Sequence, residues 1–276
     1  MYKTLLVPVD ERPRTLRAIE LAGRLAGEFN SHVIGLYVQP DPNIPLMTSL
    51  EVGEKLQEEL RDRLIREPTA RAKAQFETGM KAAGVATTEW RAAQGERAHT
   101  VALHARYADL VVINQTDPGE ADASHFAAAV LMALGRPALV VPYTGALKNV
   151  GRKVLVAWDA GREAARAVTD ALPLLRRADK VVIMAVDPRV SAKAHGEAPG
   201  ADIAVFLARH GVKAEVAPTV SAGVDVGNVI LSTASDEDAD LIVMGAYGHS
   251  RVREIVLGSA TRTVLESMTV PVLMSH

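Results

Sequence analysis

The chain of 276 residues contains no cysteine, which excludes a disulfide scaffold, a thiolate metal site and a cysteine nucleophile. Long apolar runs are also missing. The longest one, Phe126 to Leu134, is far shorter than the roughly 20 residues that span a bilayer. The N-terminus enters an apolar segment directly, without the layout of a signal peptide. We therefore expect a cytoplasmic protein with no membrane partner.

An excess of one charge is absent as well. Lys and Arg number 31 and Asp and Glu number 33, so the net charge is −2, and both signs are spread over both halves of the chain. Neither half has the basic surface that nucleic acid requires. Hydrophobic residues make up 48% and charged residues 23%, which is typical of a folded globular protein. At this length two domains are expected.

An internal repeat supports two domains. Three segments recur in the same order: Thr4–Asp10 as Lys153–Asp159, Ala108–Ile113 as Ala239–Met244, and the apolar run after Pro137 as the run after Pro271. The chain is therefore expected to contain two copies of one ancestral fold. The glycine-containing stretch between the copies predicts an N-terminal domain at 1–144 and a C-terminal domain at 152–276.

In both copies, short apolar runs alternate with helical patterns. The expected strands are Thr4–Val9, Val33–Val38, Thr87–Arg91, Leu110–Ile113 and Ala138–Val141, then Lys153–Ala157, Val181–Val186, Lys213–Ala217, Leu241–Met244 and Val270–Met274. Near-continuous apolar strands are typical of a parallel sheet that helices cover on both faces. The pattern predicts an α/β fold of two repeated doubly wound domains, each with a five-stranded parallel sheet. The extra length of the first copy falls in a helical stretch, 51–83, which Pro68 is expected to kink or break.

The fifth strands, Leu139–Val141 and Leu273–Met274, are apolar sheet edges without Lys or Glu. Such edges are normally paired or covered. We expect them to pair antiparallel within one chain, which gives an intrachain pseudo-dimer of the two copies. A homodimer of the tandem chain stays open.

Candidate chemistry lies in two loops of the second copy, because ligands of open α/β sheets bind beyond the carboxyl ends of the strands. The loop after the fourth strand has the spacing Gly245-x2-Gly248-x9-Gly258-Ser259. Its glycines let backbone amides approach an anion, and Ser259 opens a helix whose N-terminus favours negative charge. Asp159, after the first strand, has the length and polarity to accept a ribose hydroxyl. Together these features predict a nucleotide site, and the alternative is that the glycines only make turns.

These motifs resemble the universal stress protein family in its tandem two-domain form, over essentially the whole chain. The resemblance implies strand order 3-2-1-4-5 in each domain and binding of ATP or a related adenine nucleotide, with or without Mg²⁺. It also implies that Ala157 and Val186 flank the adenine. Ala160 departs from the pattern, which has glycine there. The nucleotide-binding residues that the resemblance and the loop together indicate are Ala157, Asp159, Val186, Met244, Gly245, Gly248, His249, Arg251, Gly258, Ser259 and Ala260.

The first copy differs at the same loop. It keeps Asp10 and Val38 at the positions of Asp159 and Val186, but Asn114-Gln115-Thr116-Asp117 replaces the glycine pair and the segment is three residues shorter. Carboxylates at Asp117, Glu120 and Asp122 would repel phosphates. We expect a site that is degenerate for a nucleoside triphosphate and holds a nucleoside or nothing.

Other sites are not indicated. The sequence has no P-loop, no dinucleotide fingerprint, no complete nucleophile elbow and no histidines at metal-ligand spacing. The expected function is that of a universal stress protein with ATP in its C-terminal domain and a role in stress response, rather than that of an enzyme. Slow ATP hydrolysis at the same loop and a nucleotide-free protein-interaction module are the alternatives. The stress signal and the downstream partner stay open.

Overall fold

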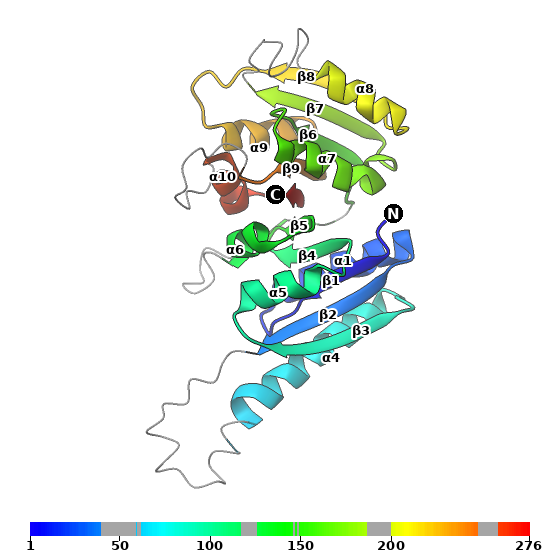
Figure 1. The fold of residues 1–276 in the computed structure, drawn as a ribbon, viewed down its shortest axis with the longest axis vertical. Coiled ribbons are helices and arrows are strands. Elements are labelled where there is room, and N and C mark those ends of the chain that lie inside the picture. Colours follow the sequence, from blue (N-terminus) through cyan, green and yellow to red (C-terminus); the bar gives the residue numbers. More distant parts are fainter. Residues whose placement is uncertain are drawn as a thin grey trace. The chain divides into compact units, whose positions relative to one another are not determined.

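The computed structural model describes residues 1–39, 59, 62–116, 126–145, 147, 149–186, 200–247 and 259–276. These residues form two compact units, Met1–Asn114 and Gln115–His276. In each unit, strands alternate with helices along the chain and the helices pack on a sheet (Figure 1). None of the helices in this described part is both long and apolar enough to cross a membrane.

The first unit contains a parallel sheet of four strands in the order β3-β2-β1-β4. Its elements are β1 (Thr4–Pro8), α1 (Thr15–Phe29), β2 (His32–Gln39), η1 (Asp62–Arg66), α4 (Glu67–Ala82), β3 (Thr88–Gln94), α5 (Arg97–Ala105) and β4 (Leu110–Asn114). Helices α1 and α4 pack against each other, and α5 contacts β1 and β2. The side chains of Leu5, Leu6 and Val7 are fully buried, as expected for a central strand that is covered on both faces.

The long helical stretch predicted for the first copy changes its winding next to Pro68. A short π-helical segment, η1, precedes α4, and Pro68 lies in the first turn of α4. Proline has no backbone N–H, and the first turn of a helix is where none is needed. The chain stays helical across Pro68, with the change from π-helical to α-helical winding between residues 66 and 67, so the stretch is not broken there and a kink stays a prediction. The part of the stretch before residue 59 lies outside the described residues.

The second unit contains six strands in the order β5-β10-β9-β6-β7-β8. Its elements are α6 (Phe126–Ala133), β5 (Ala138–Val141), β6 (Lys153–Ala157), α7 (Arg162–Leu175), β7 (Lys180–Val186), α8 (Ala201–Arg209), β8 (Glu215–Thr219), α9 (Val226–Asp236), β9 (Leu241–Gly245), α10 (Ser259–Ser267) and β10 (Val272–Ser275). The five strands of the second copy are mutually parallel and have the expected order 3-2-1-4-5. The doubly wound α/β fold predicted from the repeat is therefore present.

Strand β5, from the end of the first copy, pairs antiparallel with β10. Val140 lies opposite Val272, and Leu139 lies opposite Leu273. All four side chains are fully buried. The predicted antiparallel pairing of the two fifth strands is confirmed, and it covers two apolar edges that would otherwise be exposed.

The Ala-Asp pair repeated in both copies has a structural role. The Asp109 carboxylate accepts the N–H groups of Lys3 and Thr4, with N–O distances of 2.7 and 2.9 Å. The Asp240 carboxylate likewise accepts the N–H groups of Gly151 and Arg152, at 2.8 and 2.9 Å. In each copy this aspartate, which directly precedes the fourth strand, holds the beginning of the first strand.

Candidate functional site

The register of the second sheet brings several predicted site residues together. Ala157, the last residue of β6, lies opposite Met184 on one side and Met244 on the other. Gly245 follows Met244 and ends β9. Because β6, β7 and β9 are parallel, these residues share the carboxyl edge of the sheet, where ligands of this fold class bind.

Asp159 lies just beyond this edge and is exposed. Its Oδ1 accepts the backbone N–H of Gly161, at 2.8 Å, in the turn that leads into α7. Between them, Ala160 has a φ of 60°, in the left-handed region that favours glycine. The departure from the glycine of the family pattern therefore falls where a side chain is strained, at a cost of about 1–2 kcal/mol.

Gly245 has a packing role in addition to the one predicted from its spacing. A Cβ atom there would lie 2.6 Å from the backbone nitrogen of Ala164 and 2.8 Å from the carbonyl carbon of Glu163. Both atoms belong to the first turn of α7. The missing side chain therefore lets the N-terminal turn of α7 pack against the end of β9.

Tyr247, within the glycine loop, is a residue that sequence reasoning missed. Its φ is 66°, its backbone N–H lies 3.3 Å from the hydroxyl of Thr261 on α10, and its ring packs edge-on against His276. Its hydroxyl lies 3.5 Å from the carbonyl oxygen of Ala128 on α6. Burial raises the pKa of Tyr247 to about 12. Tyr247 thus anchors the beginning of the loop to α6 and α10, a role that no local pattern signals.

The rest of the predicted site is only partly described. Helix α10 begins at Ser259, which is exposed, and continues with the half-buried Ala260. Four predicted residues, Gly248, His249, Arg251 and Gly258, lie outside the described residues, as does the side chain of Val186. Their roles stay predictions. Elsewhere in the described chain, no group of three or more His, Asp or Glu side chains is placed to hold a metal ion.

The equivalent aspartate of the first copy has a different environment. Asp10 Oδ2 accepts a hydrogen bond from Arg97 Nη2, at 2.8 Å, and lies 3.7 Å from Arg14 Nη2. Asp10 Oδ1 accepts the hydroxyl of Thr15 and the backbone N–H of Arg12, the latter at 3.1 Å. Burial by itself would raise the pKa of Asp10, but Arg97, Thr15 and the Arg12 N–H outweigh it and leave that pKa below its ordinary value.

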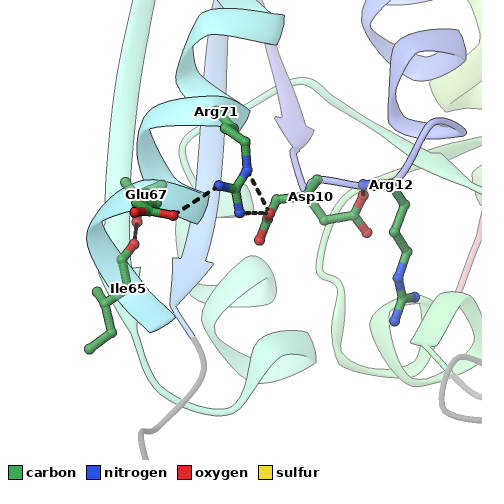
Figure 2. A network of polar contacts seen from close by, with 7 residues as sticks. Asp10, Arg12, Ile65, Glu67 and Arg71 are labelled. Carbon is green, nitrogen blue, oxygen red and sulfur yellow. Dashed lines mark hydrogen bonds and ion pairs between the residues drawn. The ribbon is translucent and has the colours of Figure 1, made fainter. Parts of the chain in front are cut away.

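A second network holds the same loop from the outside. Arg71 on α4 donates to Glu11 Oε2 through Nη2 and Nε, at 2.6 and 3.2 Å, and to Glu67 through Nη1, at 3.4 Å. Figure 2 shows Arg71 facing Glu67 on its own helix, close to the turn that carries Asp10 and Arg12. Exposed ion pairs of this kind contribute little each. Their effect here is to tie the loop after β1 to α4.

The positions that replace the glycine loop in the first copy are also occupied by side chains. Asn114 stands where the second copy has Gly245, and its buried Oδ1 has no hydrogen-bond partner among the described residues. Gln115 is fully buried, donates to the carbonyl oxygen of Leu265 at 2.8 Å and accepts the N–H of Tyr143 at 3.0 Å. Gln115 therefore fills space, and both polar atoms of its side chain have a hydrogen-bond partner. Asp117, Glu120 and Asp122 lie outside the described residues.

Comparisons with known proteins agree with this architecture. A Synechocystis protein described as Universal stress protein Slr1230 is 48% identical over 44 residues, which are 16% of this chain and 15% of that protein. Universal stress protein MJ0577 from Methanocaldococcus jannaschii is 42% identical over 45 residues, 16% of this chain and 28% of that protein. Each match thus spans less than a third of the relative.

The whole chain also has a structural counterpart. The crystal structure of a universal stress protein from Archaeoglobus fulgidus DSM 4304 aligns with 99% of this chain and 95% of its own, with a TM-score of 0.74 and 16% identity. At that identity the likeness concerns the fold. The model of the universal stress protein family matches twice, at residues 1–141 and 151–276. The chain therefore belongs to the universal stress protein family, in a tandem form that carries two copies of the family fold.

Proposed function

We propose that residues 152–276 bind ATP or a related adenine nucleotide beyond the carboxyl ends of β6, β7 and β9. In this proposal the bound nucleotide serves a role in stress response, and the first copy is mainly structural or regulatory. The repeat boundary between 144 and 152 remains part of the proposal, since the compact units of the structure divide the chain at Asn114 instead.

The observation that carries the proposal is the exposed carboxylate of Asp159 next to Ala157. The Asp159 carboxylate lies beyond a strand end, is exposed to solvent and accepts the N–H of Gly161, and each carboxylate oxygen can accept more than one hydrogen bond. The vicinal hydroxyls of a ribose are donors of the right kind. Ala157 lies in register with the buried Met184 and Met244 and is itself half-buried, so its methyl group is the apolar surface that the proposal gives the nucleoside next to a polar one.

The phosphates are assigned to the beginning of α10. Ser259 is exposed there, and the N–H groups of a first helical turn favour an anion. Gly248, His249, Arg251 and Gly258 are the other proposed contributors. Mg²⁺ commonly binds through substrate phosphates, and we propose that any Mg²⁺ enters with the nucleotide.

The first test is mass spectrometry of small molecules released from the denatured purified protein, where an adenine nucleotide is expected. The second is titration of ATP into the Asp159→Ala and Gly248→Val variants. Each should bind at least tenfold more weakly, which corresponds to about 1.4 kcal/mol. The matched control is Asp179→Ala, which removes an exposed carboxylate at the opposite edge, before β7. Unchanged ATP affinity in both site variants would indicate that the glycines of the loop only form turns.

A further inference from the structure

The carboxylate that follows the first strand differs in exposure between the two copies. Only 16% of the Asp10 side chain is exposed, and 33% of its partner Arg97. Both Asp10 oxygens are engaged, Oδ2 by Arg97 and Oδ1 by Thr15 and the Arg12 N–H. Asp159, at the equivalent position, is exposed. The acidic residue is present in both copies, and in the first copy it is mostly buried and paired with Arg97.

Arg97 reaches Asp10 because of its place on α5. It is the first residue of that helix and follows the N-cap Glu96, whose carboxylate accepts the N–H groups of Ala98 and His99. The cap fixes the beginning of the helix and hence the backbone position from which the Arg97 side chain extends. Helix α5 contacts β1, the strand that leads to Asp10.

The second copy has the same cap but a different first residue. Asp225 is the N-cap of α9 and accepts the N–H groups of Gly227 and Asn228. The first helical residue is Val226, which is partly exposed and cannot donate a hydrogen bond. One substitution, Arg97 against Val226, therefore separates the two copies at this helix position.

A nucleoside would have to displace Arg97 to reach Asp10. The hydrogen bond from a guanidinium to a carboxylate is charge-assisted and roughly twice as strong as one from a neutral hydroxyl. Opening the pair would also take the closer of two cations, Arg97 at 2.8 Å and Arg14 at 3.7 Å, away from a mostly buried carboxylate. Arg71 also pairs with Glu11 and thereby ties the residue next to Asp10 to α4.

We propose that Arg97 is the specificity-determining residue that excludes nucleosides from the first copy, by occupying the carboxylate that would receive the ribose. The inference rests on the proposed role of Asp159 in the second copy. The inference attributes the expected difference in nucleoside binding between the copies to Arg97 as well as to the missing glycines. Replacing Arg97 should expose a site for a nucleoside, formed by Asp10 and the half-buried Val38 at the end of β2.

The test uses the full-length chain and adenosine, which carries no phosphate and therefore probes the nucleoside part of the site alone. All variants carry Asp159→Ala, which silences the second copy. Adding Arg97→Ala should tighten adenosine binding at least tenfold, and adding Asp10→Ala to that variant should abolish the gain. The matched control is Arg24→Ala, which removes an exposed guanidinium that pairs with Glu20 within α1 and should leave adenosine binding unchanged.

Arg97→Met, which keeps the aliphatic part of the side chain, repeats the test if Arg97→Ala does not fold. A folded Arg97 variant without a gain, or a gain that survives Asp10→Ala, overturns the inference. If neither Arg97 variant folds, the reciprocal exchange at Val226 in the second copy is the test. Val226→Arg should weaken ATP binding at least tenfold and Val226→Met should not, and equal affinities overturn the inference. Failure of the proposed function itself is recognised separately, because wild type then binds no ATP.

Discussion

Gly245→Ala is expected to destabilise the second unit whether or not nucleotide is present. The added Cβ would lie 2.6 Å from the Ala164 nitrogen and 2.8 Å from the Glu163 carbonyl carbon, closer than unstrained structures allow. Both neighbours are backbone atoms in the first turn of α7, so no side chain can rotate away. Either α7 or the end of β9 must move.

The magnitude follows from two opposing effects. Overpacking of this kind costs about 1–3 kcal/mol. Alanine also restricts the unfolded chain, which stabilises the fold by about 0.4–1 kcal/mol. The net free energy of unfolding should fall by about 1–2 kcal/mol. At about 2–4 °C per kcal/mol for a unit of this size, the unfolding midpoint should fall by about 5 °C.

Circular dichroism during thermal and urea unfolding measures this change. The matched control is Gly135→Ala in the same unit, where a Cβ has no atom within 4 Å and φ lies outside the left-handed region. That variant should be as stable as wild type or slightly more so. If Gly245→Ala unfolds at the same midpoint as Gly135→Ala, the packing role assigned to Gly245 is wrong.

Three further outcomes are expected. Val140→Pro removes a hydrogen-bond donor from β5 in the pairing with β10 and should lower the unfolding midpoint of both copies together, whereas separate and unchanged melting would contradict the pairing argument. The pKa of Asp10 is lowered in the folded state, so its contribution to stability is complete above about pH 5, where the unfolded carboxyl is also ionised, and is lost as the pH falls through the folded value. The stability difference between wild type and Asp10→Asn in urea unfolding should therefore be constant above about pH 5 and shrink at lower pH, and a difference independent of pH would count against the network. Asp240→Ala leaves the N–H groups of Gly151 and Arg152 without their acceptor and should cost about 1–3 kcal/mol in urea unfolding, while the exposed Asp236→Ala should cost little.

Much of the fold could be predicted from the sequence, because buried parallel strands consist of nearly uninterrupted runs of apolar residues. The central strand Lys153–Ala157 has the bounds that its apolar run predicts. The edge strand β8 begins at Glu215, two residues later than expected. Val216 in that strand is 37% exposed, so burial constrains its sequence less than that of a central strand.

The candidate site was harder to predict, because its decisive contacts join residues that are distant in sequence. Asp10 and Arg97 are 87 positions apart, and Tyr247 reaches Ala128 over 119. No spacing rule signals such a pair. Gly245 shows a second limit: a glycine selected for helix packing and one selected for anion binding look identical in a sequence.

Calorimetric titration of ATP into the full-length chain tests the central claim most directly. The account predicts one site per chain, which is lost in the double variant Asp159→Ala with Gly258→Val and retained in Asp10→Ala. Two equivalent sites, or a single site that survives the double variant, would contradict the assignment of ATP to residues 152–276.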